Sequence, residues 1–188
     1  MRRIWTGVVV AIAAFEGAGC RKAQDKPVDP APFLQAMRDP RQDVNGPATL
    51  AVIRLGEPAV PGLIEMLADP DPRLRTKAAS TLWGMGGKGR TAVPALTAAM
   101  DDPEPTVRVG AAMALENMGP AAEAAVPALV DALKHRDPDV RVWSAKALGK
   151  IGSAARPALP ALKQAARNDV VRTAAEESIR LIQETPPR

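Results

Sequence analysis

A repeat of 33 residues limits the possible folds of this 188-residue chain more than any other feature of its sequence. Four kinds of residue recur at this spacing: Pro61, Pro94, Pro127 and Pro160; Arg75, Arg108 and Arg141; Leu82, Leu115 and Leu148; Gly86, Gly119 and Gly152. A unit that is shorter in its middle closes the series, and a degenerate unit opens it at Phe33. Repeats of about 20–50 residues are typical of solenoids and propellers.

Each unit predicts two short helices. The first begins at the proline, which suits an early helical position, and ends before Asp69-Pro70. The second begins near Arg75 and ends at Gly86. Apolar residues at helical spacing give both helices a buried face: Leu63, Met66 and Leu67 in the first, and Ala78, Ala79, Leu82 and Met85 in the second. One pair cannot bury this surface alone, so the sequence predicts an all-α solenoid, an α-α superhelix of about five helix pairs.

The repeat resembles the HEAT family, especially the short bacterial repeats that also occur in phycobilin lyase subunits, over about residues 30–184. The resemblance implies a ladder of hydrogen bonds between aspartate and arginine side chains of successive repeats. The residues at these positions are Asp69, Arg75, Asp102, Arg108 and Arg141. His135 replaces the aspartate of the third full repeat, and Asn45 replaces the arginine of the opening unit. Polar Glu176 and Gln183 predict a capping repeat at the C-terminal end.

The N-terminus has the order of a secretory signal. Two arginines precede the uncharged segment 4–15, which is shorter than the roughly 20 residues of a membrane-spanning helix. Gly17-Ala18-Gly19 then leads into Cys20, the only cysteine, which resembles the lipobox of bacterial lipoproteins. The resemblance implies cleavage before Cys20 and lipidation of its side chain. An ordinary secretory signal and an uncleaved N-terminal anchor remain the alternatives.

These features predict four segments. Residues 1–19 are a signal peptide, 20–32 the lipidated cysteine and a Pro-rich tether, 33–184 the repeat domain, and 185–188 a tail. Arg21 follows the cysteine, and by resemblance to enterobacterial sorting this favours the outer membrane. We therefore expect a bacterial envelope protein, attached to the membrane through its lipid.

Composition argues against several classes of function. One histidine and one cysteine cannot form a His/Cys metal cage, and any histidine-dependent catalysis would depend on His135 alone. His135 is in a turn with no nucleophile motif nearby, so we expect a solvated turn residue. Aromatic residues make up 3% and the net charge is +4, which argues against nucleic-acid binding. We expect no catalytic residues, no metal and no cofactor.

The exposed side of the second helices is the most informative surface. Residues 1, 2, 5 and 9 positions after each arginine point away from the core. They give an apolar centre of Val109, Met113, Val142 and Trp143, a basic rim of Arg54, Lys77, Lys146 and Lys150, and no acid in the central repeats. Trp83 lies on the flank. In HEAT-like solenoids this side lines the concave face, where an apolar patch with a polar rim often marks a binding site. The alternative is that neighbouring repeats or the tether cover these residues.

We therefore predict a monomeric, non-catalytic scaffold that binds an acidic, partly apolar segment of a partner protein on its concave face. A structural lipoprotein that contacts an envelope polymer or the membrane is one alternative. A lyase-type enzyme subunit is another, although no cofactor motif or acid–base constellation supports it.

Overall fold

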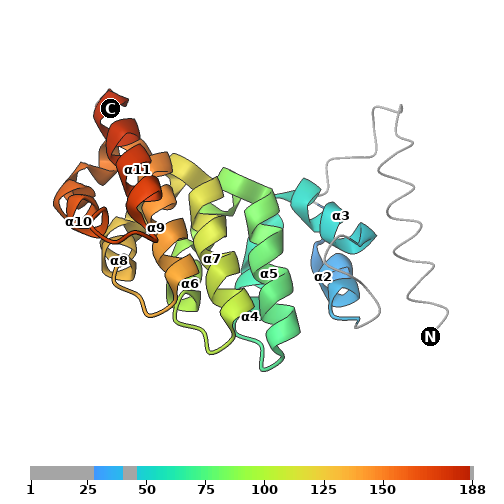
Figure 1. The fold of residues 1–188 in the computed structure, drawn as a ribbon. Helices are drawn as coiled ribbons and strands as arrows, with labels where there is room; N and C mark the ends of the chain where they lie inside the picture. The colour runs from blue at the N-terminus through green and yellow to red at the C-terminus, as the bar shows by residue number, and fades with distance from the viewer. Residues whose placement is uncertain (1–27, 40–45, 187–188) are drawn as a thin grey trace.

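The computed structural model describes residues 28–39 and 46–186. In this part of the chain, ten α-helices form five stacked pairs (Figure 1). The pairs are α2 (Ala31–Met37) with α3 (Pro47–Leu55), α4 (Val60–Leu67) with α5 (Pro72–Met85), α6 (Val93–Ala99) with α7 (Pro105–Met118), α8 (Val126–Ala132) with α9 (Pro138–Ile151), and α10 (Leu159–Ala165) with α11 (Arg172–Glu184). The prediction of an all-α solenoid is confirmed. The predicted signal peptide, Cys20 and Asn45 lie outside the described residues.

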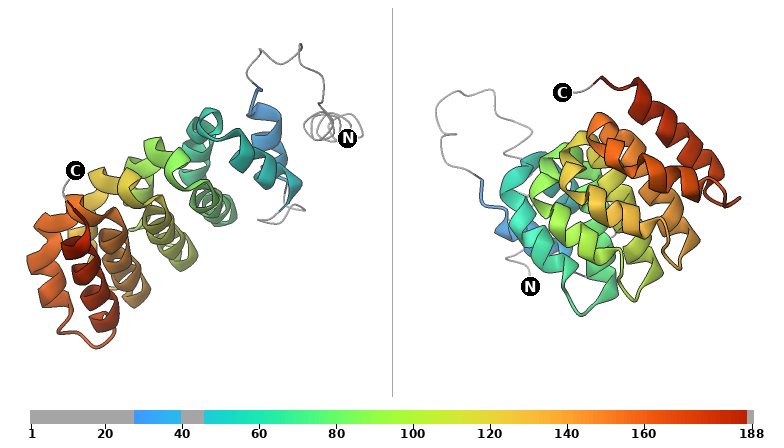
Figure 2. Two further views of the ribbon diagram at one scale, coloured as in Figure 1. Left: turned by 90° about the horizontal axis from the view of Figure 1, so that it is seen from above. Right: turned by 90° about the vertical axis from the view of Figure 1, so that its left-hand side faces the viewer.

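The helices form two layers. Figure 2 shows the first helices of the pairs in one row and the second helices in the other, so that each helix lies beside its equivalent in the next repeat. Short 3₁₀ segments connect the pairs: η1 (Glu57–Ala59), η2 (Gly86–Ala92), η3 (Gly119–Ala125) and η4 (Gly152–Ala158). We call the surface of α5, α7, α9 and α11 the second-helix face. None of the described helices is both long and apolar enough to cross a membrane.

The second helices begin three residues earlier than the sequence predicted. Helix α5 starts at Pro72 rather than near Arg75 because proline is well tolerated at the first helical position. The Asp71 side chain caps the helix by accepting a hydrogen bond from the Arg73 amide at 2.9 Å. The Asp-Pro sequence therefore starts a helix here as well as ending the one before it.

A periodic glycine ends each second helix that another repeat follows. Gly56, Gly86, Gly119 and Gly152 have φ angles between 52° and 76°, and no other described residue has a positive φ. Glycine adopts this conformation without the steric penalty that a Cβ atom brings. The last helix, α11, has Gln183 at the equivalent position, and both Gln183 and Glu176 are exposed at the end of the stack.

The core runs without interruption along the stack. Leu82, Leu115 and Leu148 are completely buried. The alanines of the second helices are completely buried too, which lets neighbouring helices approach closely: Ala78, Ala79, Ala111, Ala112 and Ala145. Each repeat therefore buries its apolar face mainly against its neighbours, as the repeat pattern requires.

Gly149 marks a close approach between α9 and α11. A Cβ atom at this position would lie 2.9 Å from the Ser178 Cα and 2.7 Å from its Oγ. We expect Gly149→Ala to lower the free energy of unfolding by about 1–3 kcal/mol, since the crowding outweighs the better helix propensity of alanine. Urea unfolding measures this change. Gly84→Ala on α5 is the matched control, because its Cβ would meet only the flexible end of Ile53. Equal stability of both variants would show that α9 and α11 can separate at little cost.

Candidate functional site

Arginine–aspartate pairs join the turns of successive repeats. Arg75 donates through Nε and Nη2 to the two carboxylate oxygens of Asp102, at 2.7 and 2.9 Å. Its Nη1 donates to the carbonyl oxygens of Asp69 and Pro70 in its own turn, at 2.9 and 3.0 Å. One guanidinium thus fixes its own turn and holds the carboxylate of the next repeat, a bidentate arrangement that is stronger than a neutral hydrogen bond.

The next junction uses a different aspartate. Arg108 donates to the Oδ2 atom of Asp137, at 3.0 Å from Nε and 2.6 Å from Nη2. His135 stands where the previous repeat has Asp102, and its Nδ1 accepts the Asp137 amide at 3.0 Å. The Oδ1 atom of Asp102 does the same for the Glu104 amide, at 2.8 Å. The imidazole of His135 thus makes the turn hydrogen bond that the aspartate makes in the previous repeat. Asp137 makes the ion pair with the arginine of the preceding repeat, Arg108.

Sequence reasoning missed Asp137 as a ladder residue. The sequence does show a carboxylate two residues after His135. That carboxylate, Asp137, is also the N-cap of α9. Arg38 was also missed. It follows α2 and donates to Asp69 at 2.7 Å, so that the opening repeat is joined to the next one.

Arg141 departs from the expected ladder. It donates through Nη1 to the carbonyl oxygens of His135 and Arg136, at 2.8 and 3.2 Å, but forms no ion pair with a carboxylate of residues 28–39 or 46–186. Its Nε is buried without a hydrogen-bond partner. The turn of the last repeat presents Asn168 at the aspartate position, and its Oδ1 accepts the Val170 amide instead. Arg141 therefore stabilises its own turn only.

The ion pairs keep the aspartates charged. The hydrogen bond from Arg108 lowers the pKa of Asp137 below its ordinary value. Burial raises the pKa of Asp102, but the hydrogen bonds from Arg75 and the Glu104 amide outweigh it, so that this pKa is lowered as well. Hydrogen bonding to Asp102 also raises the pKa of Arg75. These groups stabilise the stack as permanent charges at neutral pH.

We expect Asp137→Asn to reduce stability at neutral pH by about 1–2 kcal/mol, because asparagine keeps the helix cap but not the charge. The folded pKa of Asp137 is lower than its ordinary value of 3.8. The stabilisation is therefore complete well above pH 3.8 and is lost as the pH falls through the folded value. Urea unfolding at pH 7, 5 and 3 should show the gap between wild type and variant narrowing at pH 3. A constant gap would mean that the charge of Asp137 does not contribute.

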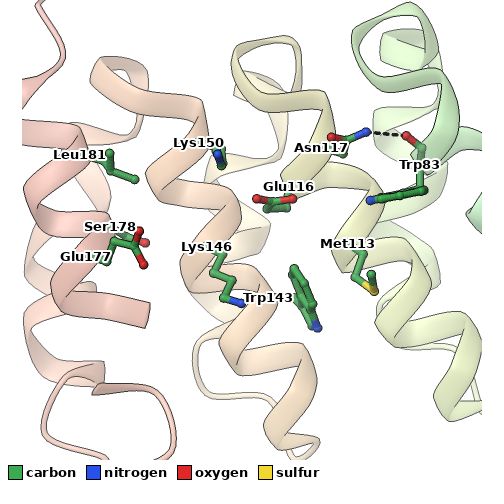
Figure 3. Close-up of a pocket in the computed structure, with 10 residues that line it drawn as sticks. All are labelled: Trp83, Met113, Glu116, Asn117, Trp143, Lys146, Lys150, Glu177, Ser178 and Leu181. Carbon is green, nitrogen blue, oxygen red and sulfur yellow. Dashed lines mark hydrogen bonds between the residues drawn. The ribbon is translucent and has the colours of Figure 1, made fainter. Parts of the chain in front are cut away.

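A pocket of about 380 Å³ lies on the second-helix face. Four successive second helices line it (Figure 3). Its residues are Trp83 on α5; Met113, Glu116 and Asn117 on α7; Trp143, Lys146 and Lys150 on α9; and Glu177, Ser178 and Leu181 on α11. Apolar and charged groups share this surface. In binding pockets, apolar side chains bury the ligand and a few polar groups fix its orientation.

Two contacts organise the pocket. The Nζ atom of Lys146 lies 4.2 Å from the ring centroid of Trp143, a cation–π contact. Asn117 donates through Nδ2 to the backbone oxygen of Trp83 at 2.7 Å and so links α7 to α5, as Figure 3 shows. Trp83 itself is 46% exposed, which is high for a tryptophan. The pocket thus keeps a large aromatic surface open to solvent.

The charged groups of the pocket have no ion-pair partners among the described residues. This holds for two lysines and two glutamates, Lys146, Lys150, Glu116 and Glu177, although all four line one hollow. At the turn edge of the stack, by contrast, Arg38, Arg75 and Arg108 each pair with an aspartate. The charges of the pocket are therefore available to an external group.

The structure brings four of the eight predicted binding residues into the pocket: Met113, Trp143, Lys146 and Lys150. Val109 and Val142 are half-buried and do not line it, and Arg54 is exposed on α3, away from it.

The expectation that Lys77 is exposed is wrong. Lys77 is only 7% exposed, and its Nζ donates to the backbone oxygen of Met37 at 2.9 Å. The long apolar stem is buried between repeats while the ammonium group satisfies the end of α2.

The expectation of an acid-free surface is also wrong, because Glu116 lines the pocket. Glu116 and Trp83 both stand eight positions after the arginine of their repeat, at the boundary between the buried and exposed sides. Boundary side chains point into the space between neighbouring helices, and here that space is the pocket. Trp83 therefore belongs to the pocket rather than to its flank.

Comparison with known proteins agrees with this architecture. No protein of curated function matches the sequence. Solved structures that share the fold include the following three. The complex of CpcE and CpcF of phycocyanin lyase from Nostoc sp. has 21% identity and a TM-score of 0.61, over 92% of this chain and 98% of that one. A designed armadillo repeat protein in complex with the peptide (KR)4 has 18% identity and a TM-score of 0.60, over 81% of each chain. The karyopherin Kap121p, bound to the extreme C-terminus of the protein phosphatase Cdc14p, has 19% identity and a TM-score of 0.57, over 81% of this chain and 19% of its own.

The sequence itself also matches a family profile. The profile described as HEAT repeats matches residues 30–103 and 93–180, which together include all five helix pairs except the last residues of α11. The stacked pairs, the periodic glycines and the arginine ladder agree with that match. The chain belongs to the HEAT repeat family.

Proposed function

We propose that this protein is a non-catalytic adaptor that binds a segment of a partner protein in the pocket on the second-helix face. The observation that carries the proposal is an exposed tryptophan in one hollow with four charged side chains that form no ion pair with any residue the structure describes. The stack of repeats holds these groups apart in water. A partner segment would bury the tryptophan and pair with the charged side chains. Two solved structures with this fold are complexes of this kind, the designed armadillo repeat protein with the peptide (KR)4 and Kap121p with the extreme C-terminus of Cdc14p.

The proposal includes an address and a mode of attachment. The signal-like N-terminus and Cys20 support a lipid anchor in the bacterial cell envelope, with the outer membrane favoured by Arg21. The segment 21–32 would serve as the tether between lipid and repeats. Radiolabelled palmitate tests this part: a Cys20→Ser variant should lose the label that the unaltered chain acquires.

Site-specific photo-crosslinking tests the binding face. A photoreactive benzoylphenylalanine at Met113 lies in the pocket, whereas the same group at Asp131 is exposed on α8, in the other layer. We expect the full chain to cross-link a defined envelope protein from position 113 and not from position 131. Adding Trp143→Ala should reduce the yield about tenfold, which corresponds to about 1.4 kcal/mol. Equal yields from both positions would refute a binding site on this face.

A structural lipoprotein that contacts an anionic envelope polymer is the second candidate. Lys146 and Lys150 support it, since unpaired ammonium groups also attract polyanions. Binding to isolated peptidoglycan that disappears at high salt and does not depend on Trp143 would favour it. A lyase-type enzyme subunit is a third candidate, supported only by the likeness in fold to the phycocyanin lyase complex. Addition of a bilin without any spectral change would exclude it.

A further inference from the structure

We propose a second binding site, at the junction between the fourth and fifth helix pairs, where Arg141 binds a carboxylate of another molecule. The carboxylate is that of an acidic side chain or of a peptide C-terminus. None of the residues that carry this proposal, Arg141, Ser144 and Asn168, lines the pocket on the second-helix face. The proposal is therefore independent of the function proposed above.

The guanidinium of Arg141 is oriented like those of Arg75 and Arg108 in the two preceding repeats. In all three, Nη1 donates to the carbonyl oxygens of the residues five and six positions earlier. The guanidinium group is planar and rigid, so that these two hydrogen bonds also fix the direction of the edge formed by Nε and Nη2. We call this edge the free edge of Arg141.

The same edge binds a carboxylate in both preceding repeats. Arg75 uses it to bind the two carboxylate oxygens of Asp102, and Arg108 uses it to bind Asp137. The free edge of Arg141 forms no hydrogen bond or ion pair with residues 28–39 or 46–186, and its Nε atom is buried. A buried donor without an acceptor is destabilising, whereas a carboxylate satisfies Nε and Nη2 together.

The turn of the last repeat provides no carboxylate for Arg141. Asn168 follows Arg141 by 27 residues, as Asp102 follows Arg75, and its Oδ1 accepts the Val170 amide. The next residue, Asp169, is exposed and forms an ion pair with Arg172 instead. An anion that binds the free edge therefore comes from outside the described part of the chain.

A second unsatisfied polar group lies on the same helix. The Oγ atom of Ser144 is completely buried and, like Nε of Arg141, has no hydrogen-bond partner among the described residues. No other buried side-chain polar atom in the described part of the chain lacks a partner. Residues three apart on a helix are neighbours on its surface. The corresponding residues of the two preceding repeats are alanines, so the unpaired donors gather at the one junction that lacks its own carboxylate.

The junction is open to a ligand. Arg141 is half-buried, and the turn opposite it is exposed at Asn168 and at Val170, whose exposed fraction is 56%. A ligand can therefore approach along the turn and meet donors whose direction is already set. Such preorganisation favours binding, since few side chains have to be ordered.

Nuclear magnetic resonance on the ¹⁵N-labelled full chain tests the site. The signal of the Arg141 Nε–H group is identified by its loss in Arg141→Lys. The probes are N-acetylaspartate amide, with a side-chain carboxylate, and N-acetylalanine, with a chain-terminal one. We expect either probe to shift this signal in a saturable manner at millimolar concentration, and the tighter binder shows which source the site prefers. Sodium chloride at equal ionic strength controls for screening.

Asn168→Asp is the decisive variant, because it supplies the carboxylate from the chain itself. The new side chain can accept the Val170 amide and bind Arg141, as Asp102 does for Glu104 and Arg75. We expect the melting temperature to rise by about 3 °C and the affinity for both probes to fall at least about tenfold. Gln35→Glu, exposed on α2 at the other end of the stack, adds the same charge and should change neither.

Four results would overturn the inference: no saturable shift of the Arg141 signal, an equal shift in Asn168→Asp, an unchanged melting temperature of that variant, or tighter binding of inorganic phosphate than of both probes. Photo-crosslinking from Met113 reports on the pocket alone. The two proposals can therefore fail separately.

Discussion

Leu115→Ala is expected to lower the free energy of unfolding by about 3–4 kcal/mol. Leu115 is completely buried on α7, in the middle repeat of the five. Alanine removes its contacts and leaves a cavity that the rigid neighbouring helices fill only in part. Because each repeat is stabilised by its neighbours, loss of the central one weakens both halves of the stack. For a chain of this size the change corresponds to a fall in melting temperature of about 10 °C, measurable by circular dichroism.

The matched control for this variant is Leu50→Ala. Leu50 is 49% exposed on α3, so that the same substitution removes little buried surface and should leave the melting temperature nearly unchanged. A small effect at Leu115 would mean that the repeats unfold independently of one another, contrary to the continuous core.

Arg108→Ala should be the second most destabilising change, at about 3 kcal/mol. Arg108 is 7% exposed and binds the Asp137 carboxylate together with the carbonyl oxygens of Asp102 and Pro103. Its removal leaves a largely buried carboxylate and two carbonyl groups without their donor. Urea unfolding should show a lower midpoint with an unchanged slope, because wild type and variant expose a similar amount of new surface when they unfold.

Arg73→Ala is the control for the loss of an arginine. Arg73 pairs with Asp71 on the surface, where its side chain is 75% exposed, and its removal should leave stability unchanged. If both arginine variants were equally stable, the ladder would be an incidental feature of the turns. A double-mutant cycle on Arg75 and Asp102 would then measure directly the coupling energy of another ladder pair.

The repeated part of the fold could be predicted from the sequence because each unit independently predicts the same pair of helices. The prolines, the buried leucines and the glycines that end the second helices agree at one period, and the structure has a helix pair for each unit. The start of the second helix was predicted three residues too late, near Arg75 rather than at Pro72, because a proline can either end one helix or begin the next. Only the cap that Asp71 provides decides between them.

The details of the site could be predicted only in part. A helical wheel separates buried from exposed positions. It does not show whether a residue at the boundary faces a neighbouring helix or solvent. Glu116 and Trp83 were misjudged for this reason. Lys77 was misjudged because its partner, the Met37 carbonyl group, belongs to a helix 40 residues earlier. Such contacts depend on how two repeats are rotated against each other, which no single repeat encodes.

The incomplete ladder has a consequence for how the molecule responds to its surroundings. Within the part of the chain that the structure describes, three junctions between repeats carry an ion pair, formed by Arg38, Arg75 and Arg108, whereas Arg141 forms none at the fourth. At the fourth junction α9 and α11 approach each other closely, with Gly149 against Ser178. Acid and salt therefore act on the first three junctions and spare the last. In hydrogen exchange, α11 and the part of the pocket it supplies should keep their protection at low pH after the N-terminal repeats begin to open.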